Sequence, residues 1–333
     1  MAVTTRRLSL AALPTPLVRA RRLERHLGHS DLYVKRDDLT GFALAGNKAR
    51  KLEFLLGDAV ARGCDVLVTG GGPSSNHCQG AAVAAAAVGL QCCLVMYGRK
   101  PVEFHPNLAL ARSCGAAVRF TGDPDRGSVD RALQRVASEL EAAGRTPYVV
   151  PRGGASPVGA LGYALAVEEL AVQLAGKSVE PDVVIVATGS CGTQAGLVAG
   201  IVAGGHPWRV IGASVSREVA ECRKRVLELA VECARLAGSP SPAPERVEVI
   251  DARGPGYGVV SHAAVRAARV AAQTEGMILD PVFTAKSFAA FLDLVDHGAV
   301  GPAVFLHTGG TPSAILEMTT AMASEEGCGD AGS

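Results

Sequence analysis

One lysine of this chain stands where covalent chemistry with a carbonyl group would need it. Lys48 recurs with Leu52 and Leu55 at the three-or-four spacing of one helical face, so its side chain is predicted to point inward. Burial and the nearby cations Arg50 and Lys51 both disfavour an ammonium group. They predict a lowered pKa for Lys48, which suits its amine to Schiff-base formation. The segment by itself also fits a solvated lysine at a helix start, the ordinary situation of this residue.

A glycine-rich turn later in the chain has the composition of a phosphate cradle. The apolar run Val183–Ala187 is followed by Thr188–Gly196, which offers hydroxyls and backbone N–H groups where a helix is predicted to begin. Its glycine spacing is not that of dinucleotide-binding folds, and it lacks the Lys-Ser/Thr ending of the nucleoside triphosphate loop. The turn therefore fits one phosphate group, with a tight structural turn as the alternative.

A second turn, Thr69–His77, links a predicted strand to an alanine-rich helix. Ser74, Ser75 or Asn76 would be an ordinary N-cap there, and this explains one of the three. The other polar side chains are left without a capping role. His77 fits either a packed or a functional position.

Two further segments approach known motifs without completing them. Leu306–Pro312 is again a glycine turn between a predicted strand and a helix, and His307 in it has no obvious carboxylate neighbour. We therefore interpret His307 as a packed or capping histidine rather than a base. Gly41–Lys48 nearly matches the nucleotide-binding loop, but the extra Asn47 and the absence of a preceding parallel strand argue against nucleotide hydrolysis.

These turns need an alternating α/β fold to bring them together. Strands are predicted over Asp65–Thr69, Gln91–Met96, Ala117–Phe120, Val183–Ala187, Arg209–Val215 and Ala303–His307. Helices are predicted over Asn47–Arg62, Asn76–Val88, Asp130–Ala143, Gly159–Leu174, Thr193–Ala203, Arg217–Leu236, His262–Glu275 and Lys286–Asp296. This alternation predicts parallel sheets with helices on both faces, and ligands that bind beyond the carboxyl ends of the strands.

The length of the chain predicts two lobes. With 333 residues, 48% of them hydrophobic, it exceeds one ordinary core. We expect a smaller substrate-side lobe, 48–155, inserted into a larger cofactor-binding lobe formed by 1–47 and 156–333. Pro/Gly-rich segments at Pro151–Pro157 and Ser239–Pro244 mark joints, and the second also fits a surface loop.

Charge and cysteine content argue against several classes of protein. Lys+Arg 33 against Asp+Glu 32 leaves a net charge of +1, so no global field attracts nucleic acid or a membrane surface, and a small-molecule partner is expected. Nine cysteines without a repeated spacing predict neither a disulfide framework nor a metal site, and they point to a reducing compartment. Neither a signal peptide nor an apolar stretch of roughly 20 residues is evident, so we expect a cytoplasmic protein.

Taken in order, the motifs resemble those of one enzyme family. They are Gly46-Asn47-Lys48-x-Arg50-Lys51-Leu52-Glu53, Ser75-Asn76-His77, Gly189-Ser190-x-Gly192-Thr193-x-Ala195-Gly196, Tyr257-Gly258, Asp280-Pro281-Val282 and His307-Thr308-Gly309-Gly310. From about Leu13 to Met318 the chain resembles the pyridoxal-phosphate family of D-cysteine desulfhydrase and 1-aminocyclopropane-1-carboxylate (ACC) deaminase. The resemblance implies a tryptophan synthase β-like, fold type II enzyme with two mostly parallel, helix-covered sheets, assembled as a homodimer with pyridoxal 5'-phosphate.

The resemblance also implies a role for each matching residue. Lys48 would carry the cofactor as a Schiff base and then act as the base at the substrate carbon. The cofactor would be held by Asn76 at its ring hydroxyl, by Thr308 at its ring nitrogen, and by Gly189, Ser190, Cys191, Gly192 and Thr193 at its phosphate. The substrate would be bound by Ser75, Asn76, His77, Tyr257 and Phe283, of which Ser75 and Tyr257 would also be catalytic.

Two positions favour the desulfhydrase branch. The deaminase branch has Glu after the aromatic residue that follows Asp-Pro-Val, and an apolar residue before the last glycine pair, where this chain has Thr284 and Thr308. We therefore expect α,β-elimination from a small β-substituted amino acid, with D-cysteine giving pyruvate, ammonia and sulfide as the leading example. ACC deamination, or elimination from cysteate or another β-substituted alanine, is the alternative.

Three departures from the family pattern predict a shifted substrate. Phe283 stands where the family has Tyr, so a phenolic proton donor is missing, and Ala45 replaces a glycine. Pro73-Ser74 replaces Ile-Gln before Ser75. The loss of the phenol also keeps open a cofactor-binding protein with a regulatory role. A kinase-like protein is disfavoured, because no acidic metal-binding motif accompanies the loop at 41–48.

Overall fold

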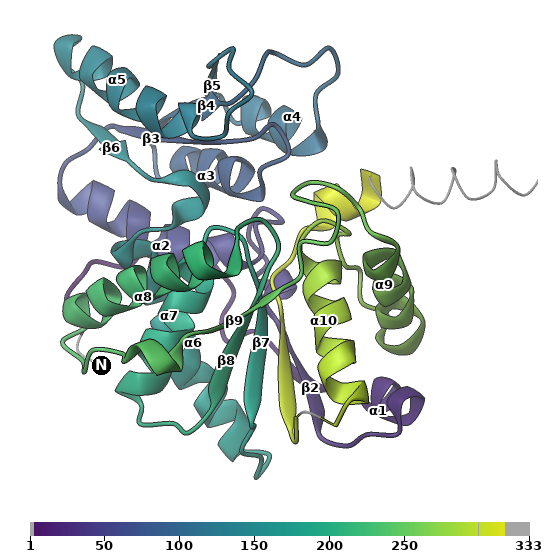
Figure 1. Ribbon diagram of the computed structural model, residues 1–333. Coiled ribbons are helices and arrows are strands. Elements are labelled where there is room, and N and C mark those ends of the chain that lie inside the picture. Colours follow the sequence, from purple (N-terminus) through teal and green to yellow (C-terminus); the bar gives the residue numbers. More distant parts are fainter. Residues whose placement is uncertain (1–2, 299, 317–333) are drawn as a thin grey trace, which may run out of the picture.

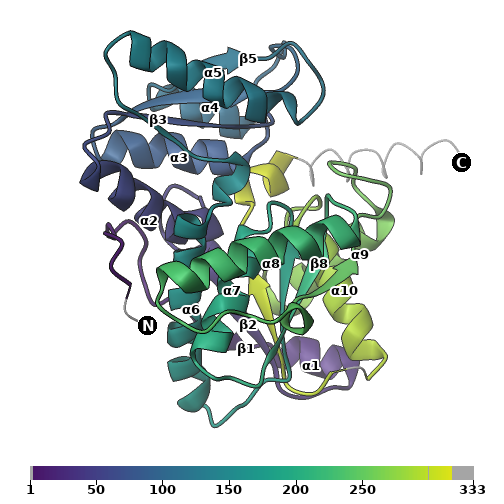
Figure 2. The same ribbon diagram turned by 60° about the vertical axis from the view of Figure 1, so that its left-hand side comes forward.

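The computed structural model describes residues 3–298 and 300–316, so Met318, at the end of the resembling stretch, lies outside the described residues. Two sheets, each covered by helices, form two lobes, with the smaller one at the top of Figure 1. Figure 2, turned by 60°, shows the same separation. The predicted fold class is confirmed. All strands of the smaller sheet fall within 48–155, although the domain boundaries themselves stay a prediction.

Six strands form the larger sheet, in the order β1-β2-β10-β7-β8-β9. They are β1 (Leu17–Arg19), β2 (Leu32–Arg36), β7 (Val183–Thr188), β8 (Arg209–Ser214), β9 (Glu248–Asp251) and β10 (Ala303–His307). β1 pairs antiparallel with β2, and the other pairings are parallel. Side chains of β7 alternate between two cores, because successive strand residues point to opposite faces.

Helices cover both faces of this sheet. Val184 and Val186 pack toward α6 (Pro157–Ala175), α7 (Gly192–Ala203) and α8 (Val219–Leu236). Val183 and Ile185 pack toward α1 (Arg21–Leu27), α9 (His262–Glu275) and α10 (Thr284–Asp296). Both faces of the strand are therefore apolar, which is why its sequence is a continuous apolar run.

The smaller sheet is fully parallel, in the order β5-β4-β3-β6. Its strands are β3 (Val66–Gly71), β4 (Gln91–Met96), β5 (Ala117–Phe120) and β6 (Pro147–Val149). One face packs on α2 (Asn47–Ala61), α3 (Asn76–Ala87) and α4 (Pro106–Ser113), and the other on α5 (Ser128–Ala142). Three short 3-10 helices, η1 (Asp37–Leu39), η2 (Arg152–Gly154) and η3 (Pro244–Arg246), lie between these elements.

The predicted elements are all present, with ends that differ by at most two residues. The short elements β1, β2, β6, β9, α1 and α4, which are three to eight residues long, are not predicted from the sequence. The expectation that no parallel strand precedes the loop Gly41–Lys48 is wrong, because β2, which pairs parallel with β10, lies before it. The Ser239–Pro244 segment leads from α8 toward β9 of the same sheet, as its surface-loop interpretation expects.

One helical stretch has the length and composition of a membrane span. It is Arg152–Ala175, which comprises η2 and α6. More than half of its most apolar window is buried inside the protein. Glu169 on α6 also forms ion pairs with Lys35 and Arg50. The buried surface and the buried charges identify a core helix.

Candidate active site

A cavity of about 690 Å³ lies between the two lobes, where the predicted glycine-rich turns meet. The turns after β3, β7 and β10 all contribute to its wall, as expected at the carboxyl ends of parallel strands. Eleven of the residues predicted from the sequence line it: Lys48, Ser75, Asn76, His77, Gly189, Ser190, Cys191, Thr193, Tyr257, Phe283 and Thr308. Gly192 lies in the same turn, directly behind that wall.

Lys48 is the second residue of α2, and its amine reaches the cavity. Gly46, with a φ of 53°, turns the chain into the helix, and the N–H of Asn47 donates to the Thr308 carbonyl at 3.0 Å. The Lys48 Nζ donates to Asn47 Oδ1 at 2.7 Å. Burial lowers the pKa of Lys48 to about 8, although the charge of Asp280 opposes this effect. The structure directs Lys48 into the cavity, and the direction of its pKa shift agrees with the expectation from the sequence.

The cations that follow Lys48 do not act on it as the sequence predicts. Arg50 is 2% exposed and is paired with Asp37 and Glu169. Lys51 is buried, and no carboxylate in the described part of the chain pairs with it. Burial, followed by the charge of Lys48, places the pKa of Lys51 well below its usual value. Burial, and not the charge of Arg50 or Lys51, lowers the pKa of Lys48.

Asp280 is the carboxylate whose charge acts on Lys48. It is fully buried, and its Oδ1 accepts hydrogen bonds from the N–H groups of Val282 and Phe283 at 3.1 and 2.7 Å. Its Oδ2 accepts from the Thr284 hydroxyl at 2.7 Å. Burial raises the pKa of Asp280, and these hydrogen bonds oppose the increase. Asp280 belongs to the Asp280-Pro281-Val282 motif, but no role for it is predicted from the sequence.

The start of α3 presents Ser75 and Asn76 to the cavity. Ser75 is the helix N-cap, with Oγ accepting from the N–H of Cys78 at 3.2 Å. Asn107 of α4 fixes Asn76, because its Nδ2 donates to Asn76 Oδ1 at 2.8 Å and to the Ser74 carbonyl at 2.9 Å. The amide oxygen of Asn76 is thereby occupied, which leaves its NH₂ group for a ligand.

His77 is a neutral histidine in the wall of the cavity. The Thr69 hydroxyl donates to the Val150 carbonyl at 2.8 Å, so it accepts from His77 Nε2, 2.9 Å away. Nδ1 then carries the lone pair, and it has no partner among the described residues. Burial lowers the pKa of His77 to about 3, and the charges of Lys48 and Lys51 contribute. The buried environment therefore keeps this imidazole uncharged.

The turn between β7 and α7 is shaped as a backbone cradle. Cys191 has a φ of 76° at the N-cap, and its buried thiol lies 3.7 Å from that of Cys222. The backbone of Cys191, not its side chain, is therefore what a ligand meets. A Cβ at Gly192 would lie 3.1 Å from Cα of Ala155 and 3.3 Å from the Nζ of Lys51, so a side chain here would crowd both, and an amine lies behind the turn.

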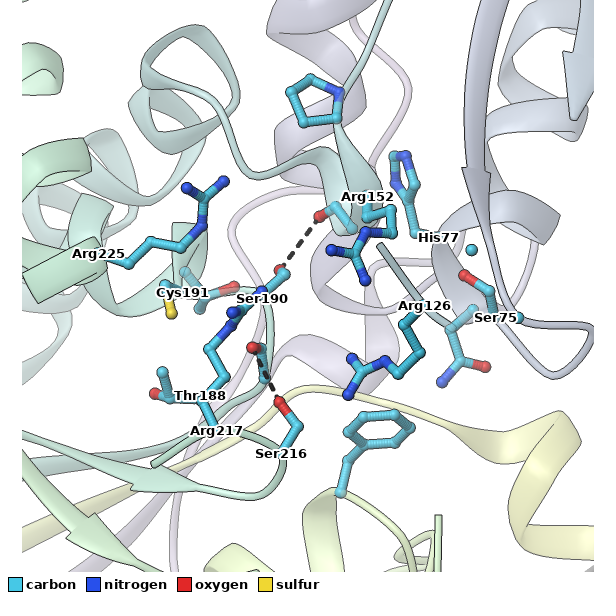
Figure 3. Close-up of a pocket in the computed structure, with 18 of the residues that line it drawn as sticks. Ser75, His77, Arg126, Arg152, Thr188, Ser190, Cys191, Ser216, Arg217 and Arg225 are labelled. Atoms are coloured by element: carbon cyan, nitrogen blue, oxygen red, sulfur yellow. Dashed lines mark hydrogen bonds between the residues drawn. The ribbon is translucent and has the colours of Figure 1, made fainter. Parts of the chain in front are cut away.

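Two serine hydroxyls tie this turn to its surroundings. Ser190 Oγ donates to the Gly153 carbonyl at 3.5 Å, and Ser216 Oγ donates to the Gly189 carbonyl at 3.1 Å, as the dashed lines in Figure 3 show. Both bonds use carbonyl oxygens, so the backbone N–H groups at the start of α7 remain directed to a ligand. Such a helix start favours an anion.

Tyr257 and Phe283 form an aromatic wall on another side of the cavity. Their ring centroids are 6.0 Å apart and their planes make an angle of 68°. The guanidinium carbon of Arg126 lies 3.8 Å from the centroid of the Tyr257 ring. Burial raises the pKa of Tyr257, while the charge of Arg126 opposes the shift. Its phenol therefore stays protonated near neutral pH.

The turn after β10 contributes Thr308, and His307 supports that turn from behind. Within the described chain, the Thr308 hydroxyl makes no protein hydrogen bond, so it is available to a ligand. The N–H of Gly309 donates to His307 Nδ1 at 3.3 Å. His307 Nε2 lies 3.7 Å from Asp38, so the expected absence of a carboxylate neighbour is wrong. Burial lowers the pKa of His307 to about 4, which fits the predicted packed or capping role.

The structure adds residues to the site that the sequence analysis does not single out. They include Asn47, Tyr97, Arg126, Asp130, Arg152, Arg217 and Arg225, all of which line the cavity. Arg126 lies in the loop after β5, a position where parallel sheets place ligand-binding groups, so the strand prediction itself carried the signal. Among the described residues, no group of three or more His, Cys, Asp or Glu side chains could hold a metal ion.

A two-lobed parallel fold with a buried lysine facing a glycine-rich helix start defines the class of pyridoxal-phosphate enzymes. The family model described as "Pyridoxal-phosphate dependent enzyme" matches residues 8–309, and the chain belongs to that family. The chain is similar to a D-cysteine desulfhydrase of Salmonella choleraesuis, with 39% identity over 318 residues, covering 92% of this chain and 94% of the relative. It is also similar to a Pyrococcus abyssi protein provisionally named as an ACC deaminase, with 38% identity over 307 residues and 92% of each chain covered.

Solved structures agree with this assignment. A crystal structure described as an ACC deaminase homologue has a TM-score of 0.87 and 37% identity, with 93% of each chain covered. A crystal structure of a threonine deaminase has a TM-score of 0.64 over 89% of this chain and 92% of that one; at 22% identity it shows the fold alone. The resemblance to the D-cysteine desulfhydrase and ACC deaminase family is confirmed, and the cofactor of the family is pyridoxal phosphate.

The residues present fit this cofactor. A primary amine with a pKa near 8 suits an aldehyde, because an appreciable fraction of it is unprotonated at neutral pH. The start of α7 and the amine of Lys51 suit a phosphate. The Thr308 hydroxyl and the NH₂ group of Asn76 are free to meet the polar atoms of the ring.

Proposed function

We propose that the protein catalyses α,β-elimination from a small β-substituted amino acid, with D-cysteine giving pyruvate, ammonia and sulfide as the leading case. One observation carries the proposal: the amine of Lys48, with its lowered pKa, shares a cavity with the α3 start at Ser75 and the turn at Gly189–Thr193. The similarity to a protein named D-cysteine desulfhydrase supports this choice.

Each end of the cofactor has residues that would hold it. Lys48 would bind its aldehyde carbon, the Gly189–Thr193 backbone its phosphate, Asn76 its ring hydroxyl and Thr308 its ring nitrogen. When bound, pyridoxal phosphate supplies an electron-withdrawing ring that acidifies the Cα–H bond of the substrate. A neutral hydroxyl at the ring nitrogen leaves that nitrogen largely unprotonated, which favours elimination over chemistry that needs a longer-lived carbanion.

The side chains of the cavity then perform the proton transfer. The Ser75 hydroxyl and the N–H groups at the start of α3 bind the substrate carboxylate. Lys48 Nζ accepts the Cα proton, and the bond from Cβ to the leaving group breaks with its electron pair on the leaving group. The resulting 2-aminoacrylate reacts with water to give pyruvate and ammonia. Tyr257, whose phenol is protonated, is placed to donate a proton to the leaving group.

The surroundings of Thr284 favour elimination over ring opening. The sequence analysis expects a glutamate at this position in the deaminase branch. Thr284 is 1% exposed, and its hydroxyl is bonded to Asp280. It therefore offers the substrate neither a carboxylate nor a free hydroxyl.

The test is turnover by purified enzyme saturated with pyridoxal phosphate. D-Cysteine, L-cysteine, cysteate and ACC are supplied separately, and ammonia and 2-oxo acid release are measured. Elimination from a β-substituted amino acid is the expected result. Activity confined to ACC would reject this branch in favour of the deaminase alternative. A cytoplasmic location and a homodimeric assembly accompany the proposal, and sedimentation of the purified protein checks the latter.

A further inference from the structure

Arg126 brings a positive charge into the cavity that no described acidic side chain balances. It lies in the loop between β5 and α5, is half-buried, and stacks on the ring of Tyr257 at 3.8 Å. Figure 3 shows Arg126 directed into the pocket that Ser75 and Ser190 also line. A stacked guanidinium keeps its in-plane N–H groups free, so this contact still leaves donors for an anion.

The acids nearest in sequence are committed elsewhere. Asp123 Oδ1 accepts from the N–H of Asp125 at 2.8 Å, and Asp125 Oδ1 accepts from the N–H of Gly127 at 3.0 Å. The second oxygens of both carboxylates face Arg131, at 3.4 and 3.5 Å. The loop is therefore ordered by its own aspartates, yet neither neutralises Arg126.

A second arginine near Tyr257, Arg152, differs from Arg126 because its charge is compensated. Arg152 makes a two-pronged contact with Asp130, with hydrogen bonds of 2.9 and 2.7 Å, so its charge is compensated. The charges of Arg126 and Arg152 both act on the Tyr257 hydroxyl, so the two guanidinium groups lie at the same end of the cavity. Two arginines and one aspartate leave this end with one surplus positive charge.

We propose that Arg126 is a specificity-determining residue that selects amino acids whose β-substituent is itself a compact oxyanion, such as a sulfonate or carboxylate. This inference rests on the proposed elimination at Lys48. The substrate carboxylate already has the start of α3, so the charge of Arg126 is available to a second anion. A planar guanidinium binds an oxyanion through two parallel hydrogen bonds, which a neutral thiol cannot accept in this way. With cysteate, the Cβ–S bond would break, sulfite would leave with the electron pair, and Lys48 would hold the Cα proton.

Binding of aspartate and asparagine to the holoenzyme tests the inference without turnover. The two amino acids are nearly isosteric and differ in the charge of the β-substituent, and neither has a good β leaving group. Each enantiomer is titrated while the cofactor absorbance is followed. For the enantiomer that the enzyme accepts, we expect aspartate to bind at least about tenfold more tightly than asparagine, and we expect added salt to reduce this preference.

Three variants identify Arg126 as the cause. Arg126→Gln should reduce the aspartate preference to about one, and Arg126→Lys, which keeps the charge, should retain part of it. Arg135→Gln removes an equal charge from a 71% exposed position on α5 and should leave the preference unchanged. If Arg126→Gln weakens aspartate and asparagine binding equally, Arg126 only braces Tyr257 or holds the shared carboxylate, and the inference is wrong.

Turnover separates this inference from the proposed function. β-Chloroalanine has a neutral side chain with a good leaving group, so any enzyme of the proposed type should eliminate it. Elimination of β-chloroalanine together with equal affinity for aspartate and asparagine would overturn the inference and leave the proposed function standing. If no β-substituted amino acid, cysteate included, releases a 2-oxo acid, the proposed function fails, and the role of Arg126 fails with it.

Discussion

The side-chain amide of Asn47 donates a hydrogen bond of 3.0 Å to Oγ1 of Thr193. The oxygen of the same amide accepts from the Nζ of Lys48 at 2.7 Å. One buried side chain thus joins the lysine at the start of α2 to the glycine-rich turn at the start of α7. This bridge links the two ends of the proposed cofactor site.

Replacing Asn47 with alanine should therefore weaken the binding of pyridoxal phosphate. Asn47→Ala leaves Thr193 Oγ1 and Lys48 Nζ without a shared partner, and lost hydrogen bonds of this kind predict a Kd for pyridoxal phosphate about tenfold higher. Fluorescence or absorbance titration of the cofactor-free protein measures the effect. Asn107→Ala, which touches Asn76 instead, should weaken binding less. Equal effects of the two changes would argue against the bridge.

Lys48→Ala should abolish the covalent attachment of the cofactor. Loss of the amine should lower the elimination rate by about 10²–10⁴-fold or more, because general-base catalysis is lost with it. Borohydride reduction followed by peptide mapping should label Lys48 in the wild type and leave the variant unlabelled. Lys177→Ala, at an exposed position just after the end of α6, serves as the control. Labelling at another lysine of the wild type would contradict the assignment.

Asp280→Asn should shift the acid limb of the pH profile for cofactor attachment to lower pH. A carboxylate favours the ammonium form of Lys48, so removing its charge lowers the pKa of Lys48 below about 8. The limb should shift by about one pH unit toward acid. The rate of cofactor attachment to the cofactor-free protein, measured against pH, reports the free amine directly. Asp293→Asn, at an exposed position, should leave the pH profile unchanged. A shift of the Asp280→Asn profile to higher pH would contradict the expected effect of the Asp280 charge on the pKa of Lys48.

Arg50→Met should destabilise the fold far more than it alters chemistry. Arg50 donates to Asp37 at 2.8 and 2.9 Å and to Glu169 at 2.8 and 2.9 Å. Its removal leaves the fully buried Asp37 carboxylate without a cation and leaves Glu169 with Lys35 alone. The expected loss in the free energy of unfolding is about 3–5 kcal/mol, measured by urea denaturation. Arg62→Met, which breaks a surface pair, should cost less than about 1 kcal/mol.

The cost of Arg50→Met should also depend on pH. Burial would raise the pKa values of Asp37 and Glu169. The charge and hydrogen bonds of Arg50, together with Thr15 and Tyr163 at Asp37 and with Lys35 at Glu169, hold both pKa values below their ordinary range. Their contribution is present above about pH 5 and is lost as the pH falls through the lowered values. The stability gap between wild type and variant should therefore narrow in acid, and a gap that widens there would contradict this account.

Elements with strong local patterns could be predicted from the sequence. The apolar runs of β4 and β10 match their predicted ends, because both faces of these parallel strands are buried and the pattern is continuous. The three-residue strands β1 and β6 could not be found in this way, since they are defined by pairing with a neighbour. Their existence depends on the sheet that they join.

The site divides in the same way. The sequence alone determined that Lys48 begins an inward-facing helix, that Gly189–Thr193 forms a turn before a helix, and that Ser75 or a neighbour caps α3, because each depends on residues close along the chain. Tertiary structure decided which charges remain unpaired. From the sequence, Arg50 and Arg126 are equally plausible charges at the site. In the structure, Asp37 and Glu169 neutralise Arg50, and no acidic side chain in the described chain pairs with Arg126. Charge compensation depends on side chains distant in sequence, so only folding determines it.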